Sequence, residues 1–146
     1  MTTVRLDDQL CFALHAASRT MTAAYREALA RLGLTYPQYL VMLTLWEDDG
    51  LTVSALGNRL KLDSGTLSPL VKRLQVQGLV ERRASTEDER RVHVHLTAAG
   101  RKLSDQAEDV ARRISGAIDI TGEEFLALRT LARKVAALDP ENPQTA

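Results

Sequence analysis

Apolar residues recur in alternating steps of four and three near both ends of the chain. This spacing places them along one stripe of a helix that packs lengthwise against a partner. The first stripe ends at Gly33, and the second follows Thr97, a typical helix cap. A third follows Thr121 and Glu124, which have the spacing of a capping box. The stripes comprise Leu10, Leu14, Ala17, Met21, Ala24 and Ala28, then Leu103, Ala107, Val110, Ile114 and Ala117, and finally Phe125, Leu128, Leu131, Val135 and Leu138.

The middle of the chain has a different pattern, in which short apolar stretches alternate with turn and cap residues. A helix is predicted to start after Thr35, with Pro37 in its first turn, where a missing N–H costs little. A short helix over 51–60, a tight turn at 61–63 and a second helix over 64–77 follow. The last two helices form a helix-turn-helix. Their expected caps and stop are Thr52, Asp63 and Gly78.

Two stretches with strand character, 79–83 and 92–96, flank a charged loop over 84–91. In the second stretch we expect the valines and the leucine to face inward, and His93 and His95 to face outward. Such a hairpin beside a helix-turn-helix is a wing. Taken alone, the hairpin could be a solvated charged loop and the helices ordinary packing, but together they favour a DNA-binding unit.

These elements predict one domain over 1–146, mainly α with a small β-hairpin wing, in a winged helix-turn-helix fold. The DNA-binding unit is expected over 51–97. The stripes of 1–33 and 98–138 exceed what one small domain needs, so we expect these segments to dimerise across a two-fold axis. The tail 139–146 is expected to be flexible.

Composition narrows the class of protein further. With 146 residues, 45% of them apolar, the chain suits one domain with a moderate core. It has no apolar run of membrane-spanning length and no signal-peptide pattern, so we expect a cytoplasmic protein without a membrane partner. The net charge is zero, but residues 51–101 hold nine Lys and Arg against five Asp and Glu. This basic segment suits phosphate.

The second helix of the helix-turn-helix has the polar face of a recognition helix. Ser64, Thr66 and Ser68 place small hydroxyl groups at its leading end, where they are expected to meet base edges in the major groove. Lys72 and Arg73 follow them and suit phosphate groups. The expected partner is double-stranded operator DNA.

The wing contributes the remaining residues predicted to bind DNA, which are Arg82, Asp88, Arg90 and Arg91. An arginine at a wing tip can enter the narrow minor groove, where the negative potential is strongest. We assign this role to Arg90. Asp88, two residues earlier, is expected to hold that arginine in shape.

Cys11 is the only cysteine and lies one turn into the first predicted helix. With no second cysteine, an intrachain disulfide is excluded. A helix N-terminus exposes unpaired N–H groups, which favour thiolate over thiol and raise reactivity. Cys11 is therefore a candidate redox sensor. The alternative is a small buried hydrophobic residue.

The chain resembles the MarR family of winged-helix regulators from about Asp7 to Leu138. The wing and strand over 88–100 are similar to that family's signature, whereas 10–14, 33–39 and 62–70 resemble its organic-hydroperoxide-sensing OhrR branch. This resemblance implies a homodimeric repressor whose reduced form binds an operator and whose cysteine is oxidised by an organic hydroperoxide, which releases the DNA. It implies neither an enzyme nor a cofactor.

The resemblance also assigns roles to individual residues. Cys11 becomes the peroxidatic thiol, and Tyr25 and Tyr36 become phenols that hydrogen-bond it. Tyr25 lies fourteen residues beyond Cys11, which is about 21 Å along a continuous helix, so the phenols must come from the partner subunit. His15 departs from the branch, which usually has a tyrosine there. It lies one turn after Cys11, and we hypothesise that it tunes the thiol; otherwise it is merely an exposed histidine.

Oxidation of Cys11 would give a sulfenic acid, which persists only until a nucleophile captures it. Without a resolving cysteine, we expect a mixed disulfide with a small cellular thiol, a backbone sulfenamide, or over-oxidation.

Three other functions would each account for part of the sequence. A thiol peroxidase would need a catalytic cluster that the sequence lacks. A repressor of the same fold released by a phenolic ligand, with Cys11 structural, is the stronger alternative. A metal sensor using His93 and His95 would be weak, because two histidines lack a third ligand. No metal site or catalytic residue is predicted.

Overall fold

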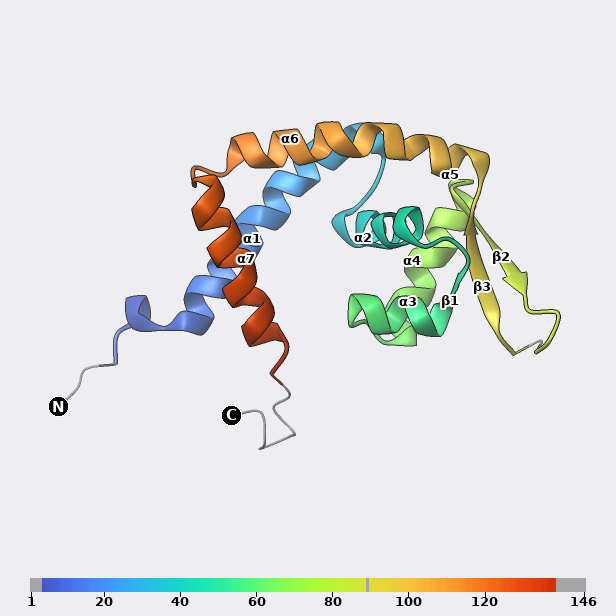
Figure 1. Cartoon of the computed structure of the whole chain (residues 1–146), viewed down its shortest axis with the longest axis horizontal. Coiled ribbons are helices and arrows are strands. Elements are labelled where there is room, and N and C mark those ends of the chain that lie inside the picture. The colour runs from blue at the N-terminus through green and yellow to red at the C-terminus, as the bar shows by residue number, and fades with distance from the viewer. Residues whose placement is uncertain (1–3, 89, 139–146) are drawn as a thin grey trace. The chain divides into compact units, whose positions relative to one another are not determined.

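A computed structural model describes residues 4–88 and 90–138. The chain forms two compact units, one through Ile114 and the other from Ser115 onward. The expected tail over 139–146 lies outside the described residues. The fold class is confirmed as mainly helical with a small antiparallel sheet. In chain order the helices are α1 (Leu10–Leu29), α2 (Tyr36–Glu47), α3 (Val53–Leu60), α4 (Ser64–Val76), α5 (Ala98–Lys102), α6 (Ala107–Ala117) and α7 (Gly122–Ala136), and the strands are β1 (Leu51–Thr52), β2 (Val80–Ala84) and β3 (Val92–Leu96) (Figure 1).

Helix α1 begins later than the sequence predicts. A single 3₁₀ turn, η1 (Leu6–Asp8), precedes it, and Gln9 is its N-cap residue. Cys11 therefore lies within the first turn of α1 and not one turn into the helix. A second 3₁₀ turn, η2 (Ala30–Leu32), follows α1 and stops at Gly33, which has a left-handed backbone (φ 66°).

Helix α2 starts as its sequence predicts. The Thr35 hydroxyl accepts a hydrogen bond from the Gln38 N–H, and the Gln38 side chain accepts one from the Thr35 N–H, so the two form a capping box. The core of the larger unit is built around this helix, since Val41, Met42 and Leu45 are inaccessible to solvent. Leu56, Leu67, Leu74 and Val94 from the helix-turn-helix and the sheet are buried as well.

Helices α3 and α4 form the predicted helix-turn-helix, with Thr52 and Asp63 as caps. The Asp63 carboxylate accepts a hydrogen bond from the Thr66 N–H at 2.7 Å, which lowers the pKa of that carboxyl. Gly57 brings the two helices close together, because a Cβ atom there would lie 2.7 Å from the Leu62 carbonyl oxygen. The turn thus depends on a residue without a side chain.

The sheet has three strands in the order β1-β3-β2, all antiparallel. The sequence predicts β3 at its observed bounds and β2 one residue early, but it misses β1, which was assigned to the following helix. The predicted alternation of β3 is observed, since Val94 and Leu96 are buried and the two histidines lie on the other face of the strand. His93 and His95 are half-buried, and the His93 Nδ1 atom lies 2.9 Å from the Gly50 carbonyl oxygen, with which it forms a hydrogen bond.

The single long helix predicted after Thr97 is interrupted. A 3₁₀ turn, η3 (Leu103–Gln106), separates α5 from α6. The Ser104 hydroxyl donates a hydrogen bond to the Arg101 carbonyl oxygen, which is the local competition that disturbs a regular helix. Thr121 and Glu124 form the predicted capping box of α7.

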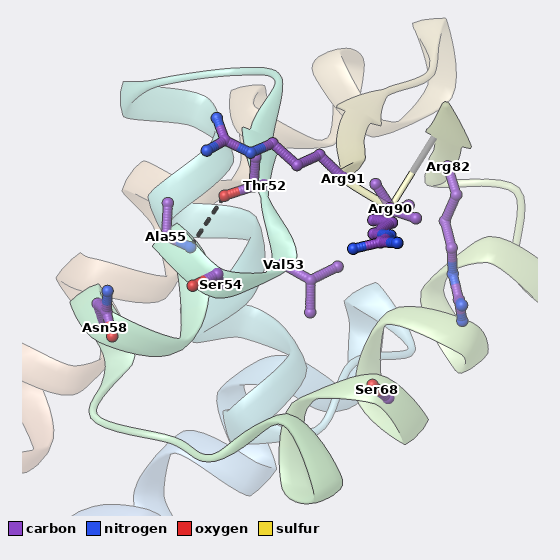
Figure 2. A pocket seen from close by; sticks show the side chains of 10 residues that line it. Thr52, Val53, Ser54, Ala55, Asn58, Ser68, Arg82, Arg90 and Arg91 are labelled. Carbon is purple, nitrogen blue, oxygen red and sulfur yellow. Dashed lines mark hydrogen bonds between the residues drawn. The ribbon is translucent and has the colours of Figure 1, made fainter. Parts of the chain in front are cut away.

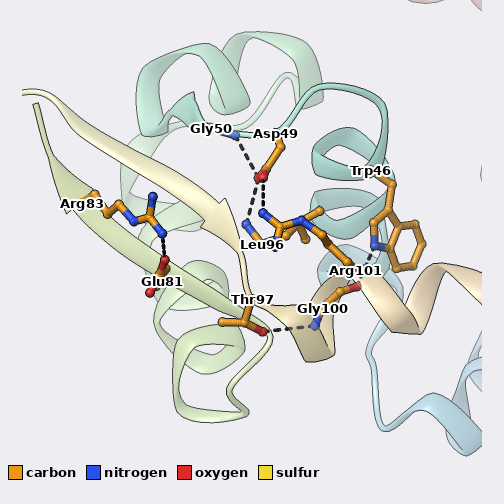
Figure 3. A network of polar contacts seen from close by, with 9 residues as sticks. All are labelled: Trp46, Asp49, Gly50, Glu81, Arg83, Leu96, Thr97, Gly100 and Arg101. Carbon is orange, nitrogen blue, oxygen red and sulfur yellow. Dashed lines mark hydrogen bonds and ion pairs between the residues drawn. The ribbon is translucent and has the colours of Figure 1, made fainter.

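A polar network fixes the end of β3 to the end of α2 (Figure 3). Asp49 accepts hydrogen bonds from the N–H groups of Gly50 and Leu96 and pairs with the Arg101 guanidinium at 3.2 Å. The Trp46 indole N–H donates to the Gly100 carbonyl oxygen at 2.9 Å. These bonds set the root of the wing against the helical core. Among the described residues, no helix is long and apolar enough to cross a membrane.

Candidate nucleic-acid interface and thiol site

Helix α4 divides into a buried and an exposed face. Leu67, Leu70, Val71 and Leu74 are buried against the core. The exposed face carries all five residues predicted on this helix, Ser64, Thr66, Ser68, Lys72 and Arg73. This is the arrangement that a recognition helix requires, because its apolar stripe anchors it while the polar side chains stay free to meet DNA.

The wing tip is held by side chains that bond to its own backbone. The Ser85 hydroxyl accepts from the N–H groups of Glu87 and Asp88. The Asp88 carboxylate accepts from the Arg90 N–H at 3.0 Å, and its carbonyl oxygen accepts from the Arg91 N–H at 2.9 Å. Asp88 therefore shapes the backbone that carries Arg90, whereas the sequence had suggested that it holds the arginine itself.

An open groove of about 540 Å³ lies between α3, α4 and the wing (Figure 2). Arg82, Arg90 and Arg91 line it together with Ser68 of α4, and Figure 2 shows Arg91 reaching across toward Thr52. Ser54 and Asn58 of α3 also line the groove. Neither residue is among those predicted from the sequence to bind DNA, although their polarity on an amphipathic helix is a signal.

The electrostatics of this surface depend on which cations remain unpaired. Arg83 of β2 forms an ion pair with Glu81, and Arg59 of α3 pairs with Glu47. Within residues 4–88 and 90–138, no ion pair takes up the remaining basic side chains predicted to bind DNA, which are Lys72, Arg73, Arg82, Arg90 and Arg91. Their charge is available to a polyanion.

Cys11 lies in the first turn of α1, and its side chain is exposed. The first α-helical hydrogen bond runs from the Ala13 N–H to the Gln9 carbonyl oxygen, so the amides around Cys11 precede the helical ladder. Leu10 is 65% exposed and Phe12 is 44% exposed, so both side chains that flank Cys11 in the sequence are apolar and accessible. His15, one turn further on, is exposed too.

Tyr25 and Tyr36 come together from α1 and α2, with ring centroids 4.8 Å apart. Tyr39, which the sequence analysis did not single out, joins them at 6.0 Å from Tyr25. Burial raises the pKa of all three phenols above the ordinary 10.0, so they are protonated near neutral pH and can donate hydrogen bonds.

The structure does not bring Cys11 to this tyrosine cluster. Helix α1 is continuous from Leu10 to Leu29, so the separation of about 21 Å between Cys11 and Tyr25 holds within one subunit. The two histidines of β3 have ring centroids 6.3 Å apart, but the described part of the chain contains no group of three His, Cys, Asp or Glu side chains suited to a metal ion.

Comparison with known proteins gives these sites a context. Residues 34–92 match the model of the MarR family. The chain is 46% identical over 127 residues to the organic hydroperoxide resistance transcriptional regulator of Bacillus subtilis, which covers 87% of this chain and 86% of that protein.

Solved structures agree with this relationship. Reduced AbfR bound to DNA is 36% identical, with a TM-score of 0.78 and 90% of each chain covered. Overoxidized AbfR bound to DNA is also 36% identical, with a TM-score of 0.74 and coverage of 92% and 96%. AbfR comes from Staphylococcus epidermidis. On this evidence the chain belongs to the MarR family and is a DNA-binding transcriptional regulator.

Proposed function

We propose that this regulator is a homodimeric repressor that senses organic hydroperoxides through Cys11 and releases its operator when that thiol is oxidised. The observation that carries the proposal is the exposed thiol in the first turn of α1, between the exposed apolar residues Leu10 and Phe12. The similar regulator of Bacillus subtilis is one of organic hydroperoxide resistance, which supports the same class of signal.

The operator would lie across the exposed face of α4 and the groove beside it. Ser64, Thr66 and Ser68 are assigned to base edges in the major groove, and Lys72 and Arg73 to phosphates. Arg90 at the wing tip is assigned to the minor groove. Arg82 and Arg91, which line the groove with Arg90, are assigned to the adjoining backbone, and Asp88 to the shape of the wing.

Apolar surface that one subunit leaves exposed supports the homodimer. On α7, Phe125, Leu126, Leu128, Leu131 and Val135 are exposed, and this helix has no buried residue. Leu6, Leu10 and Phe12 are exposed around the start of α1. Each of these exposed apolar stretches marks a surface that a two-fold partner would cover. In that dimer Tyr25 and Tyr36 of the partner subunit would supply the phenols that Cys11 lacks in its own.

The hydroperoxide is the only oxidant that the oxidation of Cys11 needs. The Cys11 sulfur attacks the terminal peroxide oxygen, the O–O bond breaks, and the alcohol leaves with a proton while sulfur becomes a sulfenic acid. A cellular thiol then attacks this sulfur, a disulfide bond forms and water leaves. His15 would assist the first step in one of two ways. A protonated imidazole would stabilise the Cys11 thiolate, and a neutral imidazole would accept the thiol proton.

AbfR is bound to DNA in its reduced and in its overoxidized form. We infer that over-oxidation of Cys11 is a poor releasing signal, and that the bulkier mixed disulfide is the form that leaves the operator. This choice also suits a chain whose only cysteine must find its resolving thiol elsewhere.

A DNA-binding titration tests the proposal directly. The duplex from upstream of the regulator's own gene is titrated with reduced protein, with protein given stoichiometric cumene hydroperoxide, and with protein given hydroperoxide plus cysteine. We expect tight binding in the first case and loss in the third, with Cys11 shown by mass spectrometry to carry the added thiol. Cys11→Ser should bind equally in all three. An unmodified Cys11 in protein that nevertheless releases DNA would refute the mechanism.

The second candidate is a repressor released by a phenolic ligand, with Cys11 structural. The cluster of the half-buried Tyr25 and Tyr36 with the buried Tyr39 favours it, because aromatic side chains with protonated hydroxyls suit such a ligand. The same titration with a phenol in place of the hydroperoxide separates the two, since Cys11→Ser would then still release the DNA.

A further inference from the structure

Two glutamine side chains join the recognition helix to the segment that leads into α2. The Gln77 Nε2 atom donates to the Gly33 carbonyl oxygen at 2.9 Å, and the Gln38 Nε2 atom donates to the Gln77 Oε1 atom at 3.3 Å. The Gln38 Oε1 atom accepts from the Thr35 N–H at 2.9 Å. We call this chain of hydrogen bonds, from Gly33 through Gln77 and Gln38 to Thr35, the amide clamp.

The direction of every bond in the amide clamp is set by its two ends. A carbonyl oxygen at Gly33 only accepts, and an N–H at Thr35 only donates. The Gln77 amide must therefore turn its nitrogen to Gly33 and its oxygen to Gln38, which in turn gives its nitrogen to Gln77 and its oxygen to Thr35. If either amide turned around, two bonds would be lost at once, so the clamp fixes one geometry.

The amide clamp connects two surfaces with different roles. Gln77 is the C-cap residue of α4, and Lys72 and Arg73 line the same hollow of about 360 Å³ as the two glutamines. At the other end, Thr35 and Gln38 bracket Tyr36, whose ring packs against Tyr25. These bonds would therefore carry a shift of the Tyr36 segment to the end of α4.

The two glutamines differ in burial in a way that suits a transmitting element. Gln38 is only 4% exposed and belongs to the capping box, so it moves with the start of α2. Gln77 is exposed, so water can replace its partners when the segments separate. The buried Gln38 can therefore hold the amide clamp in one geometry, while the exposed hydrogen bonds of Gln77 can be exchanged for bonds to water.

We propose that Gln77, through the amide clamp, is a positioning residue that makes the placement of α4 depend on the segment carrying Tyr36. The proposal also has a regulatory part, which is that oxidation of the partner's Cys11 beside Tyr36 changes the DNA-binding face through the amide clamp. This part rests on the function proposed above. Its positioning part rests only on the family's DNA binding.

A double-mutant cycle on DNA affinity tests the positioning part without any peroxide. Operator affinity is measured by fluorescence anisotropy for reduced wild type, Gln77→Ala, Tyr36→Leu and the double variant. We expect the effects to be non-additive by about 2- to 30-fold in Kd, because both changes act on one linked element. Gln75→Ala provides the control: Gln75 is an exposed glutamine on the same helix that takes no part in the clamp. Combined with Tyr36→Leu, it should be additive.

The regulatory part is tested with hydroperoxide plus cysteine. In wild type the treatment should raise Kd, and in Gln77→Ala the ratio of treated to untreated Kd should fall by about 2- to 30-fold while Gln75→Ala keeps the wild-type ratio. Mass spectrometry confirms equal modification of Cys11, and thermal melting confirms folding.

The outcomes separate the two proposals. If wild type ignores the hydroperoxide but the double-mutant cycle is non-additive, the sensing function fails and the clamp stands as a positioning device. If Gln77→Ala and Tyr36→Leu are additive, the clamp is refuted whatever the peroxide does. If the cycle is non-additive but Gln77→Ala keeps the full response, Gln77 positions α4 and does not transmit the signal.

Discussion

At the scale of single residues, Asp88 distinguishes a structural role from an electrostatic one. It is an acidic side chain on a surface assigned to a polyanion, so a charge argument alone says that its removal strengthens DNA binding. The structure gives the opposite sign, because its carboxylate accepts from the Arg90 N–H and shapes the wing tip.

We therefore expect Asp88→Ala to weaken operator binding by about 3- to 10-fold, as the loss of one hydrogen bond to a charged group frees the tip. Asp88→Asn should keep most of the affinity, since its amide oxygen can still accept. Glu87→Ala removes the same charge without that bond and should bind at least as tightly as wild type. Anisotropy titrations at one salt concentration decide, and tighter binding by Asp88→Ala would contradict the role given to Asp88.

The three tyrosines make a second prediction at this scale. Their pKa values are raised above 10.0 in the folded state, first by burial and for Tyr25 and Tyr39 also by neighbouring phenols. A raised pKa in an acid favours the protonated form, so this contribution to stability is complete below pH 10 and is lost as pH rises through the folded pKa. In a spectrophotometric titration near 295 nm, all three should ionise above pH 10 in folded protein, and near pH 10 in urea. A folded-state phenol that ionises below pH 10 would contradict the packing.

At the scale of elements, capping chemistry made much of the fold predictable. Thr35, Thr52, Asp63, Thr97 and Thr121 all act as the N-caps that their positions predict. Such caps are local, because a side chain two or three residues away satisfies the exposed N–H groups. Strand β3 is likewise visible in its own alternation.

What escaped the sequence depends on partners distant along the chain. Strand β1 has two residues and exists only because β3 pairs with it, so no local pattern marks it. In the candidate sites, Ser54 and Asn58 become candidate DNA contacts only because they line the same groove as the wing arginines. Gln77 becomes a candidate positioning residue only because it bonds to Gly33 and Gln38. Tyr39 joins the tyrosine cluster through the fold of α2 against α1.

Gly100 shows the same dependence and yields a prediction. A Cβ atom there would lie 2.0 Å from the Leu79 carbonyl oxygen, which is backbone and cannot rotate away. Gly100→Ala should therefore push α5 from the root of β2 and lower the free energy of unfolding by about 1–3 kcal/mol. Gly116→Ala, in α6 with open space around it, should be neutral or stabilising by up to about 1 kcal/mol. Urea denaturation of both compares them, and equal stabilities would refute the close approach.

At the scale of the whole molecule, the neutral chain carries basic side chains on α4 and the wing that no ion pair among the described residues takes up. We expect DNA binding to depend not on the total number of Lys and Arg residues in 51–101 but on how many of them lack an ion-pair partner. Lys72 remains unpaired within the described residues and Arg59 is held by Glu47, although both belong to this basic segment.

Salt dependence measures this distinction. Lys72→Gln should reduce the slope of log K against log salt by about 1 per subunit, because one phosphate contact is lost. Arg59→Gln removes the same charge from the same segment and should leave the slope nearly unchanged. If both variants change the slope equally, binding follows the net charge of the segment, and the assignment of Lys72 to a phosphate is wrong.

The apolar side chains of α7 give a prediction about the dimer interface. Leu131 is 61% exposed in the single chain, so its replacement costs a monomer little. In a dimer that covers this stripe, Leu131→Gln removes buried apolar surface and should shift the equilibrium toward monomer by about 10-fold or more. Arg133→Gln lies on the opposite side of the same helix, two positions further on, and should leave the dimer intact.

Sedimentation equilibrium gives the association constant, and operator titrations show its consequence. Two half-sites are held at once only if the subunits stay together, so Leu131→Gln should lose affinity for a two-half-site duplex far more than for a single half-site. A dimer constant unchanged by Leu131→Gln would move the interface away from this stripe. Tyr25 and Tyr36 of the partner subunit would then have to approach Cys11 through a different dimer interface.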